Sequence, residues 1–191
     1  MQTQQQSIES ERLGPLASLV GTWEGEKGRD ISPIAQESEE TRYRESISFE
    51  PVGPIKNGSQ ALYGLRYATH AWTYGDEHLL HEELGYWLWS PDDRQIIRCF
   101  TKHNGIAINA GGQCDHDDAQ CLEMSAQVDA EIFGIASNPA LNQGFKAVSY
   151  RFTLDMQDEY HFSYIEEMRL KNGSEEGEFI HKEENELTKL F

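Results

Sequence analysis

The sequence predicts an all-β protein that forms one domain of about ten antiparallel strands. Three observations support this prediction. Apolar and polar residues alternate in several runs, turn-forming residues separate these runs, and 191 residues with 4 Trp, 8 Tyr and 8 Phe can supply one well-filled core. Strand runs at this spacing are typical of a β-sandwich or of an up-and-down barrel.

The alternation is clearest at residues 148–156, where every second residue is apolar, and it recurs at 43–49 and 160–164. A period of two indicates a strand with one buried face. Turn-forming residues between such runs are expected to end the strands. They occur at Asn57-Gly58, Gly75-Asp76, Pro91-Asp92-Asp93, Asn104-Gly105, Gly111-Gly112, Gln157-Asp158 and Asn172-Gly173.

Two segments depart from this pattern. Leu13, Leu16 and Val20 share one helical face, and the neighbouring Gly14-Pro15 limits the segment to a short helical turn or 3₁₀ plug. Residues 1–12 before it are read as a polar tail, and 13–191 as the barrel domain. Residues 131–143 show no periodicity and contain Pro139, so they are expected to form a long loop or a short helix over one end of the fold.

Composition limits the partners and the compartment. The net charge of -17 and the pI of about 4.7 disfavour nucleic acids and anionic membranes. No apolar stretch approaches the roughly 20 residues of a membrane span. The three cysteines lack zinc-type spacing and a secretory signal is absent, so we expect a soluble cytoplasmic protein. A homodimer is kept open as an alternative to a monomer.

Several segments carry a family resemblance. Gly21-Thr22-Trp23, directly after the short turn, resembles the opening of lipocalin and fatty-acid-binding-protein barrels. The segments 25–34 and 43–49, and His81-Glu82-Glu83-Leu84-Gly85-Tyr86-Trp87, are similar to motifs of the nitrobindin-type heme-binding barrels. The order of Phe162, Met168 and a late histidine, His181, also matches that family. These segments span nearly the whole chain.

The resemblance implies a single ten-stranded antiparallel up-and-down β-barrel whose open end holds heme b. It also implies a histidine near the C-terminus as the iron ligand, and ferric heme that reacts with nitric oxide or isomerises peroxynitrite. Carried onto this chain, His181 would be the proximal ligand and metal site, and His81 would lie near the distal face of the heme. One flat apolar ligand would then occupy the barrel interior.

The chain differs from the family at two contact regions. The family's Pro-Leu-x-x-His is replaced by Glu178-Phe179-Ile180-His181, after a longer loop. The family's Tyr-Pro-Thr-Ile is replaced by 31–34, which makes Pro33 and Ile34 the candidate contacts there.

Each candidate site residue has an alternative structural explanation. The acidic neighbours of His181 could orient an iron ligand but would raise its pKa, and a solvated histidine explains the same residues. On a regular strand His81 shares a face with Glu83 and Gly85, and Gly85 would leave space above a flat ligand. The alternative is a core histidine bonded to a carboxylate. His103, before a predicted hairpin turn, is a secondary candidate at the barrel mouth.

Other residues have weaker claims. Arg29 and Asp30, expected in a loop, could fix a polar ligand group, although such pairs usually face solvent. His78 and His81 are three residues apart and would point to opposite faces of a strand, which excludes a shared zinc ion. Trp23 is expected to plug the barrel base.

Two functional classes follow. The first is a heme-binding barrel, with peroxynitrite isomerase-like activity implied by the resemblance. The second is a non-enzymatic carrier or sensor of a fatty-acid-like or aromatic metabolite. In that case Arg66, Arg98 or Arg151 would anchor a carboxylate if it pointed inward. No catalytic elbow or phosphate-binding loop is present.

Overall fold

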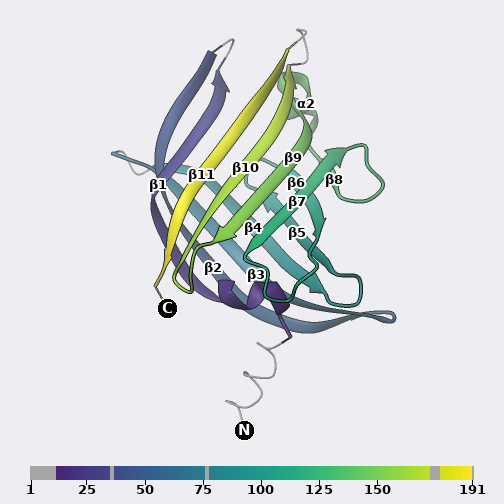
Figure 1. Cartoon of the computed structure of the whole chain (residues 1–191). Helices are drawn as coiled ribbons and strands as arrows, with labels where there is room; N and C mark the ends of the chain where they lie inside the picture. The colour runs from purple at the N-terminus through teal and green to yellow at the C-terminus, as the bar shows by residue number, and fades with distance from the viewer. Residues whose placement is uncertain (1–11, 35–36, 76–77, 173–176, 191) are drawn as a thin grey trace.

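The computed structural model describes residues 12–34, 37–75, 78–172 and 177–190. In this part of the chain the strands, whose side chains alternate between the inside and the outside, form a sheet that closes into a barrel (Figure 1). The strands of this described part are β1 (Gly21–Ile34), β2 (Glu37–Asn57), β3 (Gln60–Thr73), β4 (Leu79–Ser90), β5 (Gln95–Lys102), β6 (Ala107–Gln113), β7 (Cys121–Val128), β8 (Gly134–Ala136), β9 (Phe145–Met156), β10 (His161–Asn172) and β11 (Glu178–Lys189). Their order around the barrel is β1-β11-β10-β9-β7-β8-β6-β5-β4-β3-β2. The barrel and the all-β class are therefore confirmed.

The predicted number of ten strands is wrong, because the described chain forms eleven. The additional strand is β8, which is three residues long and lies between β6 and β7. β8 runs parallel to β7 and antiparallel to β6, while β6 and β7 also pair directly at Gly111 and Ser125. A closed ring of strands that alternate in direction needs an even number, so the eleventh strand forces one parallel pair.

The segment 131–143 contains this strand and most of a helix, where the sequence indicated only a loop or a helix. The helix α2 (Pro139–Gly144) begins at Asn138, whose side chain accepts a hydrogen bond from the backbone N–H of Leu141 at 3.1 Å. This N-cap satisfies one of the free donors of the first turn, and Pro139 fits the first helical position.

One predicted turn is also wrong. Gly111 and Gly112 lie inside β6 rather than in a turn. At each of them a neighbouring group occupies the space that a side chain would fill. A Cβ on Gly112 would lie 1.9 Å from the carbonyl oxygen of Glu123, and one on Gly111 would lie 2.2 Å from the Phe133 ring. These glycines permit a close approach between strands rather than a reversal of the chain.

The lower end of the barrel is closed. The 3₁₀-helix η1 (Gly14–Leu19) lies across this end, and its Leu16 and Leu19 side chains are fully buried (Figure 1). The Trp23 indole N–H donates to the Leu19 carbonyl at 2.8 Å, and its ring packs edge-on against Phe162. The predicted plug of a helical turn and Trp23 is confirmed. Neither η1 nor α2 is long and apolar enough to cross a membrane.

The upper end is where β1 and β11 separate. Their register ends at Ile31 paired with Lys182, and beyond it β1 continues with β2 while β11 continues with β10. The two hairpins project separately from the barrel in Figure 1. His181 is the first residue of β11 past this point, and we call this end the mouth.

The barrel interior below the mouth is filled with side chains. Aromatic residues pack toward η1, with Trp87 against Phe49, Tyr67 and Phe152 at ring distances of 5.5–6.3 Å. The cavity that these side chains line measures about 20 Å³, which is room for about one water molecule. This cavity is therefore much smaller than the flat apolar ligand that the resemblance implies.

Candidate functional site

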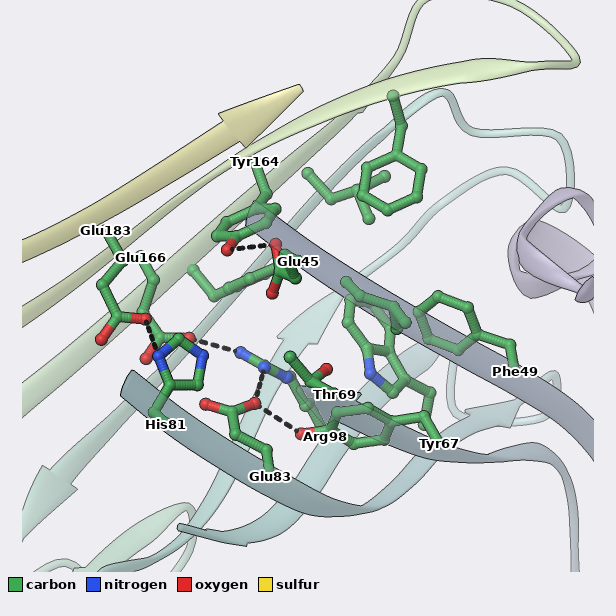
Figure 2. A pocket seen from close by; sticks show the side chains of 15 residues that line it. Glu45, Phe49, Tyr67, Thr69, His81, Glu83, Arg98, Tyr164, Glu166 and Glu183 are labelled. Carbon is green, nitrogen blue, oxygen red and sulfur yellow. Dashed lines mark hydrogen bonds and ion pairs between the residues drawn. The ribbon is translucent and has the colours of Figure 1, made fainter. Parts of the chain in front are cut away.

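Charged side chains occupy the interior between the aromatic core and the mouth. Arg98 of β5 donates from Nη2 to Oε2 of Glu83 at 2.5 Å and from Nη1 to Oε2 of Glu166 at 2.8 Å. The same Nη1 contacts the Tyr150 hydroxyl. Figure 2 shows the guanidinium lying between the two carboxylates, which come from opposite walls of the barrel. Arg98 therefore ties β4 to β10 through the interior.

Lys102, four residues further along β5, extends this network toward the mouth. Its ammonium lies 2.7 Å from Oε1 of Glu166, 3.1 Å from Oε1 of Glu83 and 3.3 Å from Oε1 of Glu183. Burial alone would lower the pKa of Lys102, but the three carboxylates raise it well above its usual range. Lys102 is therefore a fixed cation.

Four residues at the mouth form what we call the mouth cluster: Asp30, His81, His181 and Glu183. The His181 Nε2 lies 2.6 Å from Oδ2 of Asp30 and 3.3 Å from Oε1 of Glu183. The His81 Nδ1 lies 3.8 Å from the other oxygen of Glu183, Oε2. One carboxylate thus faces two histidines, one from β4 and one on its own strand.

The two members of the Asp30–His181 pair shift each other's pKa. Burial raises the pKa of Asp30, but the hydrogen bond and charge of His181 outweigh it, and the net pKa is lowered. Burial lowers the pKa of His181, but the hydrogen bond to Asp30 and the charge of Glu183 produce a net increase. The pair therefore favours an imidazolium beside a carboxylate.

Glu45 of β2 lies on the other side of the interior without a cation in contact. Its Oε2 accepts hydrogen bonds from the Tyr164 hydroxyl at 2.9 Å and from the Asn185 amide at 3.1 Å. Burial is the largest influence and raises the pKa of Glu45 to about 7. Glu45 thus holds a proton through much of the range below neutral pH.

The predicted site residues occupy different positions. His81 and His181 both point inward, and their imidazoles lie beside the same Glu183 carboxylate. His103 is exposed in the turn between β5 and β6, where its Nδ1 accepts from the Glu82 backbone N–H at 3.1 Å. Pro33 pairs with Ser38 in the β1–β2 hairpin, beyond the last β1–β11 pair. Ile34 ends β1, and its side chain is outside the described part.

The space expected above Gly85 does not exist. A Cβ there would lie 2.1 Å from the Cys99 carbonyl oxygen and 2.7 Å from the Phe100 Cα. β5 therefore approaches β4 at the position that was predicted to be open. Gly85 shares the inward face with His81 and Glu83, as predicted, but it supports strand packing.

Sequence reasoning missed the charged interior. Asp30 and Arg29 lie within β1 rather than in a loop. Of the three arginines considered as carboxylate anchors, Arg66 and Arg151 are exposed and Arg98 points inward, where two carboxylates of the chain already hold it. The signal for the missed residues was the period of two itself. In β10 the inward positions 162, 164, 166 and 168 continue through Glu166.

The comparisons with known proteins agree with this fold. The chain matches the THAP4-like, heme-binding beta-barrel domain over residues 12–189. No curated protein matches it. The crystal structure of Rv2717c from M. tuberculosis aligns with a TM-score of 0.65 and 19% identity over 92% of this chain and 95% of that one, which shows a shared fold. The predicted nitrobindin-type resemblance is confirmed, since the family match spans the barrel from η1 to β11: the chain belongs to the family of THAP4-like heme-binding β-barrel domains.

Proposed function

We propose that the barrel binds heme b at the mouth and that His181 is the protein ligand of the iron. The observation that carries this proposal is the setting of the His181 imidazole. It points inward where β1 and β11 separate, its side chain is 23% exposed, and Nε2 is held by the Asp30 carboxylate. It is therefore within reach of a ligand that arrives through the mouth.

The residues present fit an imidazole-ligated iron. Ligating histidines usually donate one ring N–H to a carboxylate or carbonyl, which fixes the ring and makes it a stronger ligand. Asp30 is placed to accept from Nε2, and Ser32 in turn contacts Asp30. Among the described residues, Nδ1 of His181 makes no polar contact, so its lone pair is available in the neutral tautomer.

The other residues at the mouth would help to bind the heme and to orient His181. Lys102 fixes the Glu183 carboxylate, and Glu183 separates His181 from His81. His81, from the opposite wall, would lie on the distal side of the ligand. When bound, ferric heme supplies the iron centre for nitric oxide binding or peroxynitrite isomerisation. The protein contributes the histidine, the orienting carboxylate and a mouth with one entrance.

A hemin titration tests this function. Purified protein should develop the Soret band of histidine-ligated heme at one equivalent, and His181→Ala should abolish that band. His103→Ala is the matched control, because His103 lies at the same end but is exposed in a turn. An unchanged band in the His181 variant would remove His181 from the proposal, and failure of the native chain to bind hemin would remove heme.

The interior disfavours the alternative of a fatty-acid or aromatic-metabolite carrier. Arg98 is occupied by Glu83 and Glu166, and the enclosed space holds about one water molecule. An acyl chain would therefore have to displace packed aromatic and charged side chains.

We further infer a reducing compartment, the cytoplasm. Cys99, Cys114 and Cys121 are all free thiols, and burial raises the pKa of each. Structural disulfides are usual in small extracellular domains and rare in the cytosol. The net charge of -17 makes nucleic acid an unfavourable partner there.

A further inference from the structure

We propose that the mouth cluster is also a binding site for one divalent transition-metal cation, which Asp30, His181 and Glu183 bind directly with His81 as a fourth donor, in the absence of porphyrin. The inference goes beyond heme binding, because the donors are side chains of the chain itself. Imidazole with carboxylate suits first-row ions such as Zn²⁺, Fe²⁺ and Co²⁺.

The donor atoms are close enough to share one ion. One ligand atom from each of Asp30, His181 and Glu183 lies within 4.8 Å of the others. Ligands held about 2.0–2.2 Å from one tetrahedral ion are roughly 3.4 Å apart. The 3.3 Å between His181 Nε2 and Glu183 Oε1 already matches this separation. Asp30, at 2.6 Å from the same nitrogen, would move by less than about 1 Å.

A buried nitrogen without a partner points independently to a ligand here. His81 is 7% exposed, and its Nδ1 has no hydrogen-bond partner among the described residues. It faces Oε2 of Glu183 at 3.8 Å, an ion-pair contact that Figure 2 marks with a dashed line and that is too long for a hydrogen bond. Buried polar atoms in folded proteins nearly always have a partner, and leaving one without costs about 1–3 kcal/mol. A metal ion between these residues would give Nδ1 its partner.

The charge of the interior favours a divalent cation over a monovalent one. Asp30, Glu83, Glu166 and Glu183 are buried carboxylates, and the buried cations beside them are Arg98 and Lys102. Four negative charges are set against Arg98, Lys102 and the imidazolium that the Asp30–His181 pair favours. This leaves one uncompensated negative charge, or two when a metal ion replaces the His181 proton, and such charge is expensive to bury. One divalent ion with neutral histidines compensates that charge.

Lys102 affects the site without excluding an ion. Its ammonium shares Oε1 of Glu183 with His181, so its charge lowers the affinity for a cation. The same contact holds the carboxylate in place, as the outer partners of metal ligands usually do. Oε2 of Glu183, on the side of His81, remains outside this contact.

The test uses the heme-free full chain and two probes, Zn²⁺ by isothermal titration calorimetry and Co²⁺ by visible absorption. We expect one equivalent of each ion to bind, with the d–d bands of a low-coordinate Co²⁺ site. Glu183→Gln and Asp30→Asn, which keep the side-chain shape, should each weaken binding at least tenfold. Circular dichroism would establish that both variants are folded.

The matched control is His161→Ala at the closed end. His161 Nδ1 lies 2.8 Å from an Asp158 oxygen, an exposed histidine–carboxylate pair without the rest of a cluster. This variant should bind both ions as the native chain does. Equal binding by the native chain and Glu183→Gln, loss of binding in His161→Ala, or no one-equivalent binding at all would each overturn the proposal.

The outcome separates this site from the proposed heme function. Zinc binding without hemin binding would remove the heme proposal and leave this one. Hemin binding without zinc binding would do the reverse.

Discussion

Asp30 and Glu45 are both buried carboxyl groups of the barrel interior, yet their pKa values move in opposite directions. Asp30 contacts an imidazole, and its pKa is lowered. Glu45 contacts the neutral Tyr164 and Asn185 side chains, and burial raises its pKa to about 7. The nearest partner, rather than the depth of burial, decides which carboxyl group is charged at neutral pH.

The raised pKa of Glu45 predicts that stability falls as pH increases. An unfolded glutamate has a pKa near 4.5. Between that value and about 7 the folded chain binds one proton more than the unfolded chain, so deprotonation costs on the order of 3 kcal/mol of unfolding free energy by pH 8. Glu45→Gln, which resembles the protonated acid, should be more stable than the native chain at pH 8 and similar at pH 5, measured by urea unfolding.

His181 changes stability with the same sign, so the comparison must be between variant and native chain at each pH. Its raised pKa supplies stability at low pH that is lost as pH rises through the folded value. Glu166, with a lowered pKa, loses its contribution only toward strongly acid pH. A difference between Glu45→Gln and the native chain that stays constant from pH 5 to 8 would contradict the role of Glu45.

The interior arginine predicts a large effect of one substitution. Arg98→Met removes one of the two cations that contact Glu83 and Glu166, leaves Lys102 as their only cation among the described residues, and should cost about 3–5 kcal/mol. Arg94→Ala breaks an ion pair with Asp117 that is about half exposed, and should cost less than about 1 kcal/mol. Chemical denaturation of both variants measures the difference. Equal costs would mean that the network contributes no more than a surface pair.

At the scale of the strand, the local sequence was sufficient to predict a strand wherever one of its faces is buried against the core. The runs at 148–156 and 160–164 were predicted because burial on one side imposes a period of two. β8 could not be predicted, since its three residues are paired only through contacts with β6 and β7. Gly111 and Gly112 were misread as a turn because the groups that need their space come from other segments.

The candidate site was predictable only in part, for the same reason. Local motifs identified His81 and His181, but the sequence does not indicate that both face Glu183, because strand register and barrel closure bring β4 and β11 together. Arg98 was considered only as an anchor for a ligand carboxylate and Lys102 was not singled out, whereas three glutamates of the chain compensate both charges and allow their burial. Contacts between strands that are far apart in the sequence therefore could not be predicted from local motifs.

The close contact of β6 with β7 predicts the effect of one added methyl group. Gly112→Ala would place a Cβ 1.9 Å from the Glu123 carbonyl oxygen, so the strands must separate, and we expect a loss of several kcal/mol or failure to fold. Gly144→Ala is the control, because no atom lies within 4 Å of its Cβ position. Thermal unfolding of the two variants compares them. A Gly112 variant as stable as the native chain would contradict the close contact.

For the molecule as a whole, the net charge of -17 acts as a general repulsion. Most acidic side chains are on the surface, where like charges destabilise the compact state and dissolved salt screens them. The interior network is shielded from that screening by burial.

We therefore predict that salt stabilises the barrel. The urea midpoint at pH 7 should rise between about 20 mM and about 500 mM NaCl, since the Debye length shortens from roughly 20 Å to about 4 Å. Potassium chloride in place of sodium chloride should give the same rise, because the effect is one of screening. A midpoint that falls with salt would mean that surface ion pairs outweigh the repulsion.

The plug formed by η1 has a kinetic consequence. Because η1 closes the base of the barrel, ligands enter and leave only through the mouth, so an incoming ligand cannot displace a bound one from the opposite side. If a metal ion occupies the mouth, hemin uptake should approach a plateau rate set by departure of the ion, whatever the hemin concentration. The packed interior between η1 and the mouth leaves no second route, so the plateau should persist when the leucines that seal the base are truncated.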